Sequence, residues 1–169
     1  GLIVPMGYWV IARACHDLAQ MKKRNMAPVH VAVNMSFRQF QDSALLSTVK
    51  RLLERTGIDP HWLEFELTET AVMQQPEQVL MTMDGMTGLG LRFSLDDFGT
   101  GFSSFVHLHS LPINLLKIDR SFVKAIAERT ADRQLVGAMI DMGHSLGLEV
   151  VAEGVEYRDQ LEILRSLGC

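Results

Sequence analysis

Hydrophobic and polar positions follow two different periods along the chain. Short runs rich in β-branched residues alternate with a period of two, as β-strands do, whereas longer segments repeat apolar residues every three or four positions, as α-helices do. The first pattern predicts five strands, at Val29–Asn34, Trp62–Thr68, Leu91–Asp96, Leu115–Asp119 and Glu149–Glu153. Because helical segments separate them, we expect the strands to run parallel in an α/β fold.

The helical periodicity predicts five helices. The first begins at Pro5, a favourable residue for a first turn, and ends at the basic run of Lys22 to Arg24, which complements the helix dipole. Its predicted inner face contains Trp9, Ile11 or Ala12, Cys15, and Leu18 or Ala19. The others are predicted at Ser43–Thr56, which Gly57 ends, and at Pro76–Met86, Leu135–Leu146 and Gln160–Leu167, with a short turn at Phe102–His109.

The even spacing of the predicted strands fits the βα repeats of a barrel and also a doubly wound sheet, and periodicity does not choose between them. In both architectures the functional site lies at the carboxyl ends of the strands. The polar residues at or just after those ends are Asn34, Glu66, Glu69, Asp96, Asp97, Lys117, Asp119, Glu153 and Glu156.

Composition narrows the class of protein. The chain has 169 residues, of which 47% are hydrophobic and 21% charged, which is typical of one globular domain with its own core. A net charge of −4 argues against DNA or RNA as a partner, because phosphate binding needs a basic face. The longest apolar stretch, Gly1–Ala12, is too short to span a bilayer, so no membrane insertion is expected of this segment.

A cluster of carboxylates at one sheet edge has a physical cost. Two carboxylates about 4 Å apart repel each other by roughly 4 kcal/mol at an effective dielectric constant near 20, so the cluster must bind protons or cations. Carboxylate oxygens together with the amide oxygen of Asn34 suit Mg²⁺ or Mn²⁺. His107 and His109 have no nearby cysteine partner, which disfavours zinc.

The segment "DDFGTGFSS" at 96–104 and the lysine at 117 carry most of the chemical information. Adjacent side chains on a strand point to opposite faces, but a bend in the following glycine-containing loop can bring both aspartates to one site. An ordinary flexible turn is the other interpretation of this loop. Lys117 can balance the charge of the carboxylates, or hold a water molecule or a phosphate oxygen, and the two roles are compatible.

Five ordered motifs resemble the EAL domain family, the bacterial phosphodiesterases that hydrolyse cyclic di-GMP. They are "VNMS" at 33–36, "ELTET" at 66–70, "DDFGTGFSS" at 96–104, "LKIDRSFV" at 116–123 and "VVAEGVE" at 150–156. The resemblance implies a (β/α)₈ TIM-like barrel with a site for two ions, Mg²⁺ or Mn²⁺, and the opening of one phosphodiester to give linear pGpG.

The resemblance also implies a role for each residue. Asn34, Glu66 and Asp96 resemble ligands of one ion, and Asp96 bridges to a second ion held by Asp97 and Glu153. The implied catalytic residues are Lys117, Glu69 and Asp119. Lys117 is similar to the lysine that contacts the attacking water, and Glu69 resembles the glutamate that anchors the "DDFGTG" loop. Glu156 is expected to support the metal ligands without binding an ion itself.

A complete barrel of this class needs about 250 residues and eight strands. We therefore expect residues 1–169 to be an EAL phosphodiesterase domain truncated at both ends, with about five strands and without the Glu-Ala-Leu segment that names the family. By resemblance, a homodimer and a diguanylate cyclase or sensor domain in the parent chain are expected as partners, in the cytoplasm or on the cytoplasmic side of a membrane receptor.

Two other functions compete with this one. A catalytically silent EAL module could bind cyclic di-GMP or a protein partner as a sensor, but such modules lose catalytic motif residues that this chain retains. The third and most distant alternative is another divalent-metal barrel, acting on a carbonyl or phosphate substrate. Binding of cyclic di-GMP distinguishes the EAL interpretations from the last one.

Overall fold

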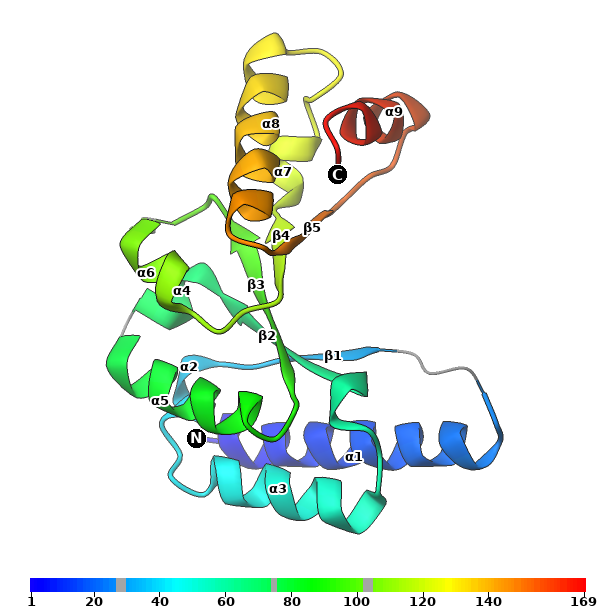
Figure 1. The fold of residues 1–169 in the computed structure, drawn as a ribbon, viewed down its shortest axis with the longest axis vertical. Coiled ribbons are helices and arrows are strands. Elements are labelled where there is room, and N and C mark those ends of the chain that lie inside the picture. The colour runs from blue at the N-terminus through cyan, green and yellow to red at the C-terminus, as the bar shows by residue number, and fades with distance from the viewer. Residues whose placement is uncertain (27–29, 74–75, 102–104) are drawn as a thin grey trace. The chain divides into compact units, whose positions relative to one another are not determined.

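The computed structural model describes residues 1–26, 30–73, 76–101 and 105–169, in which helices and strands alternate along the chain (Figure 1). The chain divides into two compact units. The first comprises Gly1–Leu67 and Ala71–Phe93, and the second comprises Thr68–Thr70 and Ser94–Cys169. Strands pair in parallel within both units, so the predicted parallel α/β class is confirmed.

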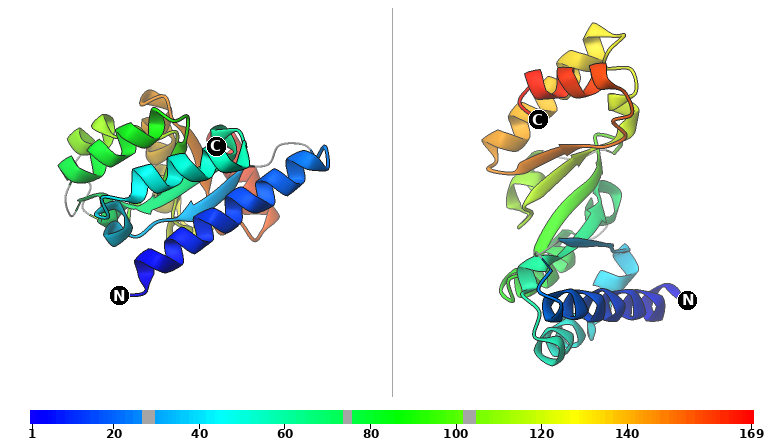
Figure 2. Two further views of the ribbon diagram at one scale, coloured as in Figure 1. Left: turned by 90° about the horizontal axis from the view of Figure 1, so that it is seen from below. Right: turned by 90° about the vertical axis from the view of Figure 1, so that its right-hand side faces the viewer.

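The first unit places one parallel strand pair beside two long helices. Strand β1 (Val31–Asn34) pairs with β2 (Leu63–Thr68), and Asn34 lies opposite Glu66. Helices α1 (Ile3–Lys23) and α3 (Leu45–Thr56) lie side by side in Figures 1 and 2. The other elements of this unit are α2 (Phe37–Phe40), the 3₁₀ helix η1 (Pro60–Trp62) and α5 (Pro76–Thr87).

Aromatic side chains fill the core of the first unit. Phe65 of β2 and Phe93 are both fully buried, with ring centroids 5.9 Å apart. Phe40 packs against Phe93 on the other side, at 6.3 Å. Tilted rings at these separations add to the stabilisation that comes from burying their apolar area.

Phe65→Ala is expected to lower the free energy of unfolding by about 3–5 kcal/mol, because it removes a buried ring and leaves a cavity. Urea denaturation measures the change. Leu46→Ala is the control, since Leu46 is 37% exposed and should lose much less. Equal losses in the two variants would contradict the assignment of Phe65 to the core.

The second unit contains two parallel strands and the part of a third strand, β3 (Arg92–Phe98), from Ser94 onward. Strand β4 (Leu115–Ile118) pairs with β3 on one side and with β5 (Glu149–Ala152) on the other. The helices that accompany them are α6 (Phe105–Ser110), α7 (Arg120–Val123), α8 (Thr130–Ser145) and α9 (Arg158–Ser166). Their buried faces include Val123, Val136, Ile140 and Leu164.

Helix α1 departs from its predicted limits and face. It begins at Ile3 rather than Pro5, and Trp9 is 66% exposed instead of buried. The buried stripe consists of Gly7, Ile11, Cys15 and Leu18. The side chain of Gln39 occupies the space where Gly7 would carry a Cβ, so the absence of a side chain is what brings this helix turn into the core.

Most other helix and strand boundaries differ from the prediction by one or two residues, but α8 begins at Thr130 rather than Leu135. The strand predicted from Val29 begins at Val31, and residue 29 lies outside the described residues, as do Phe102, Ser103 and Ser104 of the predicted loop and turn. Gly57 ends α3 in the left-handed conformation (φ 62°), as predicted. Short helices that the periodicity did not reveal are α2, α4 (Glu69–Met73) and α7.

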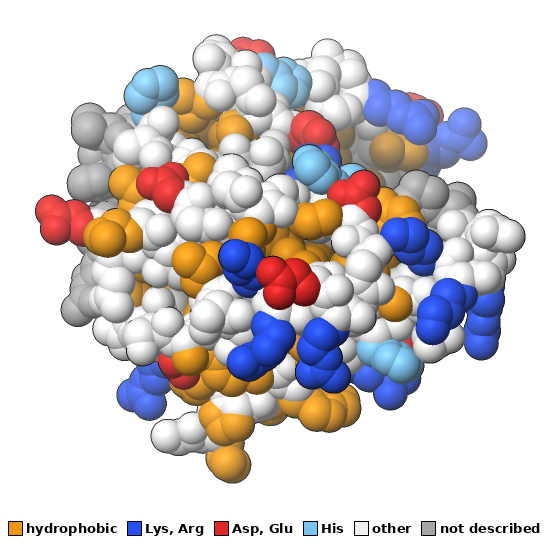
Figure 3. All heavy atoms as spheres, turned by 60° about the horizontal axis from the view of Figure 1, so that its bottom comes forward, with side chains coloured by type: hydrophobic (Ala, Val, Ile, Leu, Met, Phe, Trp, Pro, Cys, Tyr) orange, Lys and Arg blue, Asp and Glu red, His pale blue; other side chains and the backbone are white. Residues whose placement is uncertain are grey.

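The surface carries both signs of charge. On the face drawn in Figure 3, Lys and Arg side chains lie among hydrophobic and acidic ones. This mixture agrees with the small excess of 20 acidic over 16 basic residues. Within the described residues, no helix combines the length and the apolarity that crossing a bilayer requires.

Candidate functional site

Lys117 joins two carboxylates that come from the strands on either side of it. Its Nζ lies 3.2 Å from Oδ1 of Asp96 on β3 and 2.6 Å from Oε1 of Glu153, the residue that follows β5. The backbone N–H of Glu153 donates to the carbonyl of Ile118 at the end of β4. The Lys117 side chain is only 14% exposed, so solvent screens these ion pairs less than it screens surface pairs.

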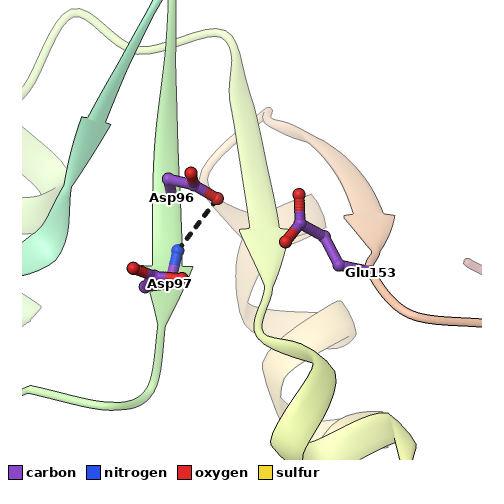
Figure 4. A group of neighbouring side chains, drawn as sticks. All are labelled: Asp96, Asp97 and Glu153. Atoms are coloured by element: carbon purple, nitrogen blue, oxygen red, sulfur yellow. Dashed lines mark hydrogen bonds between the residues drawn. The ribbon is translucent and has the colours of Figure 1, made fainter. Parts of the chain in front are cut away.

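Asp96, Asp97 and Glu153 form one acidic cluster at the carboxyl ends of β3 and β5 (Figure 4). Each offers an oxygen, and these oxygens all lie within 4.8 Å of one another. The carboxylates of Asp96 and Glu153 point toward each other, and the backbone N–H of Asp97 donates to Oδ1 of Asp96 at 3.1 Å. From here on, the name acidic cluster covers these three carboxylates together with Lys117.

A bulge in β3 explains how two consecutive aspartates join one cluster. Leu95 pairs with Leu116 and Phe98 with Ile118, so β3 uses one more residue than β4 over the same length. Asp97 has a φ of 55°, in the left-handed region that few residues other than glycine adopt. A bulge of this kind interrupts the alternation of side chains and redirects one of them.

The electrostatics of the acidic cluster favour a bound cation. Burial, followed by the neighbouring charges of Asp96, Asp119 and Glu153, raises the pKa of Asp97, while Lys117 opposes the shift. A raised carboxyl pKa means that the ionised form is disfavoured where it stands. A divalent cation would relieve this repulsion, and three carboxylates are the oxygen donors that Mg²⁺ and Mn²⁺ prefer, so the donor set fits these ions.

Glu69 holds the backbone of the loop that follows β3. It is the first residue of α4 and only 1% exposed, and its Oε2 accepts hydrogen bonds from the N–H groups of Gly99 (3.0 Å) and Gly101 (3.2 Å). A Cβ on Gly101 would lie 2.9 Å from the Glu69 carboxyl carbon. A Cβ on Gly99 would lie 2.8 Å from the ring of Phe122, so both positions need glycine.

Glu69→Ala is expected to release this loop. Two backbone N–H groups lose their acceptor, at a cost of about 1–3 kcal/mol for each one left buried and unpaired. Amide hydrogen exchange at Gly99 and Gly101 should accelerate, and the free energy of unfolding should fall. Glu69→Gln, which keeps a side-chain oxygen, is the matched control and should retain slow exchange. Unchanged exchange in the alanine variant would show that another group holds the loop.

Asp119 and Glu156 follow the ends of β4 and β5. Asp119 is the N-cap of α7, and its Oδ1 accepts the N–H of Ser121 at 3.0 Å. Hydrogen bonds from Ser121 lower the pKa of Asp119, which keeps it ionised near Asp97. The side chain of Glu156 is exposed, and its backbone N–H donates to Gln160 at 2.8 Å.

The other two predicted ligands belong to the first unit. Asn34 is the last residue of β1, and Glu66 lies opposite it on β2, two residues before that strand ends. The side chain of Asn34 is exposed and that of Glu66 partly buried. The two units thus divide the predicted residues, and the second contains Glu69, Asp96, Asp97, Lys117, Asp119, Glu153 and Glu156.

The structure adds a residue that the sequence reasoning missed. Gln160 is 3% exposed and contacts the loop between β5 and α9. A glutamine three residues after a helix N-cap is half of a capping box, and that spacing could have revealed it. The N-cap is Tyr157 rather than the usual serine or threonine, which hid the signal.

Comparison with known proteins identifies the family. The family model of the EAL domain matches residues 1–169. MucR of Pseudomonas aeruginosa, described as a bifunctional diguanylate cyclase/cyclic di-GMP phosphodiesterase, is 38% identical over 169 residues, which are 100% of this chain and 25% of MucR. NbdA of the same organism, described as a cyclic di-GMP phosphodiesterase, is 38% identical over 100% of this chain and 22% of NbdA.

Solved structures agree with this result. The structure of the MucR phosphodiesterase in complex with c-di-GMP has a TM-score of 0.93 and 38% sequence identity, and the match covers 100% of this chain and 68% of that one. The chain spans about a quarter of the length of the curated relatives it matches. Since the family model matches from the first residue to the last, the chain belongs to the EAL domain family.

Proposed function

We propose that this chain is part of one EAL phosphodiesterase domain that uses Mg²⁺ or Mn²⁺ to hydrolyse cyclic di-GMP to linear pGpG. The acidic cluster is the observation that carries the proposal, because three carboxylate oxygens within 4.8 Å of one another and a lysine stand at strand ends in a chain of this family. Relatives described as cyclic di-GMP phosphodiesterases support the substrate.

The proposed ligands are Asp96, Asp97 and Glu153 from the acidic cluster, with Asn34 and Glu66 added by their motif positions. Together these residues would hold two divalent ions. When bound, divalent ions stabilise negative charge on the phosphate and lower the pKa of water. The role of the carboxylates is to hold that positive charge at one point and to fix its geometry.

Lys117 is proposed to act on the reacting atoms. Water attacks phosphorus and loses a proton to solvent as the new P–O bond forms. The bond to the 3′ oxygen breaks, and that oxygen takes up a proton from solvent to become a hydroxyl group. The Lys117 ammonium donates a hydrogen bond to the attacking water or to a phosphate oxygen as negative charge builds up. Asp119 stays ionised beside the site, and Glu69 keeps the loop after Asp97 in place.

A hollow lies between the segments that follow β4 and β5, and its lining includes Gly154, the residue after Glu153. It measures about 640 Å³, and its lining includes Arg120, Lys124 and Tyr157 from the segments that follow β4 and β5. The carboxylates of Glu128 and Glu156 line it as well. We propose that the two cationic side chains take a phosphate and the aromatic ring a purine base. This chemistry matches a cyclic dinucleotide better than a small carbonyl compound.

The setting of the domain is part of the proposal. One relative is described as bifunctional, and the chain spans 25% of it, which supports a diguanylate cyclase or sensor domain on the same polypeptide. We place the activity in the cytoplasm, alone or as the cytoplasmic part of a membrane-bound protein.

Chromatography of the products of cyclic di-GMP tests the function. We expect the complete domain to give pGpG in the presence of Mg²⁺ or Mn²⁺ and none after chelation with EDTA, and we expect residues 1–169 alone to give much less. Binding of cyclic di-GMP without any product, in both metals, would identify a sensor module instead. Failure to bind the dinucleotide at all would contradict both EAL functions.

A further inference from the structure

Gln160 ties the loop that follows Glu153 to the rest of the second unit. Its Oε1 accepts hydrogen bonds from two consecutive backbone N–H groups of this loop, those of Glu156 (2.8 Å) and Tyr157 (3.0 Å). Its Nε2 lies 3.5 Å from the carbonyl oxygen of Val123, the last residue of α7. The side chain is 3% exposed, so water cannot replace these partners freely.

The loop from Glu153 to Tyr157 is held at both ends. At its start, the Glu153 N–H donates to Ile118, the last residue of β4. Gly154 follows with a φ of 69°, and a Cβ there would lie 2.6 Å from the Cβ of Arg120 on α7. At its other end Gln160 fixes the backbone. Glu153 therefore stands on a short segment whose path is set by close contact with α7 and by Gln160.

We propose that Gln160 is a positioning residue for the acidic cluster, an inference that rests on the proposed function. Its contacts link the two segments that leave the site, since α7 directly follows Asp119 and the 153–157 loop carries Glu153. Without the amide, both N–H groups lose a buried acceptor and the loop has to move. The carboxylate of Glu153 moves with it, away from the oxygens of Asp96 and Asp97.

A glutamine at this place also has a simpler role, because it caps the N-terminus of α9. Capping alone predicts that its loss destabilises α9 and leaves the acidic cluster unaffected. If Gln160 positions the acidic cluster, its loss should weaken metal binding more than another substitution in α9 that lowers the stability by the same amount. Leu164, which is 3% exposed on the same helix, provides that comparison.

The experiment compares three variants with the wild-type protein. Gln160→Met has a similar size and no hydrogen-bonding oxygen. Gln160→Glu keeps an oxygen that accepts the two N–H groups. Leu164→Ala weakens the packing of α9 and leaves Gln160 in place. For each, we measure the dissociation constant of Mn²⁺ by titration, the melting temperature, and kcat and KM for cyclic di-GMP.

Gln160→Met is expected to weaken Mn²⁺ binding about 10-fold, which is the low end of the loss typical for residues that support metal ligands. It should also lower kcat with little change in KM. Gln160→Glu should recover most of the affinity. Leu164→Ala should lower the melting temperature without changing the Mn²⁺ affinity. Equal Mn²⁺ affinity in Gln160→Met and the wild type, or equal losses in Gln160→Met and Leu164→Ala, would overturn the inference.

Hydrogen exchange in the wild type gives a test that needs no variant. If the loop and the acidic cluster are coupled, Mn²⁺ should slow exchange of the Glu156 and Tyr157 amides, because coupling between two events is reciprocal. Unchanged exchange on saturation with Mn²⁺ would contradict the inference. A wild-type protein that neither binds Mn²⁺ nor hydrolyses cyclic di-GMP would instead refute the proposed function.

Discussion

Asp96→Asn is expected to lower kcat for cyclic di-GMP by about 10²–10³ or more and to weaken Mn²⁺ binding over 10-fold. The substitution keeps the size of the side chain and removes its charge. Asp96 stands at the centre of the acidic cluster, since its Oδ1 contacts both Lys117 and the Asp97 N–H. Product chromatography and Mn²⁺ titration measure the two effects, and Glu66→Ala tests the proposed ligand of the first unit in the same way.

Asp141→Asn is the matched control for this prediction. It makes the same change of charge at an exposed position of α8. We expect normal turnover and normal Mn²⁺ affinity from it. Turnover of Asp96→Asn close to that of this control would refute the assignment of Asp96 as a metal ligand.

Lys117→Met is expected to separate catalysis from metal binding. The variant should lose about 10²–10³ in kcat, because no ammonium group remains to stabilise charge on the attacking water or the phosphate. It should bind Mn²⁺ at least as tightly as the wild type, because the positive charge 3.2 Å from Asp96 and 2.6 Å from Glu153 is removed. Steady-state kinetics and Mn²⁺ titration give the two quantities independently.

Lys50→Met, at an exposed position of α3, controls for the loss of one positive charge and should leave both quantities unchanged. The informative result is the pair of changes in Lys117→Met. If its Mn²⁺ affinity and its kcat fell together, Lys117 would serve to hold the carboxylates in place rather than to act on the substrate.

The strands were predicted well because burial leaves a strong mark on their composition. In the segment 62–68, apolar residues alternate with polar ones, and the observed strand β2 begins at Leu63. For predicting the site, residues at strand ends were more informative than residues at strand starts, because Lys117 and Glu153 were identified as polar residues that follow apolar runs. Periodicity left the choice between a barrel and a doubly wound sheet open, and the match to the EAL family decided it.

Short helices and side-chain choices escaped the sequence reasoning for physical reasons. Helices α4 and α7 have five and four residues, too few for an apolar stripe to repeat. Trp9 was placed in the core because of its hydrophobicity, but the neighbouring Gly7 takes that place against Gln39. A glycine that makes room for a side chain from another element has no hydrophobic side chain of its own, so hydrophobic periodicity does not reveal that it is buried.

The geometry of the site was less predictable than its residues. A bend that brings Asp96 and Asp97 to one place was anticipated in the following loop, and the structure puts it inside β3 instead. Positive φ at a non-glycine residue depends on the neighbours that hold it and cannot be inferred from residue type. The support from Gln160 comes through backbone groups, which look the same in every sequence.

The extra residue in β3 changes how relatives of this protein should be aligned. A strand without it would offer consecutive acidic side chains to opposite faces, and only one of them would reach the acidic cluster. A one-residue gap at 96–97 in a homologue therefore removes the bulge together with one carboxylate, while Phe98 keeps its place opposite Ile118. The position of insertions and deletions in this strand, together with the identity of its residues, should separate metal-binding family members from those that only recognise the dinucleotide.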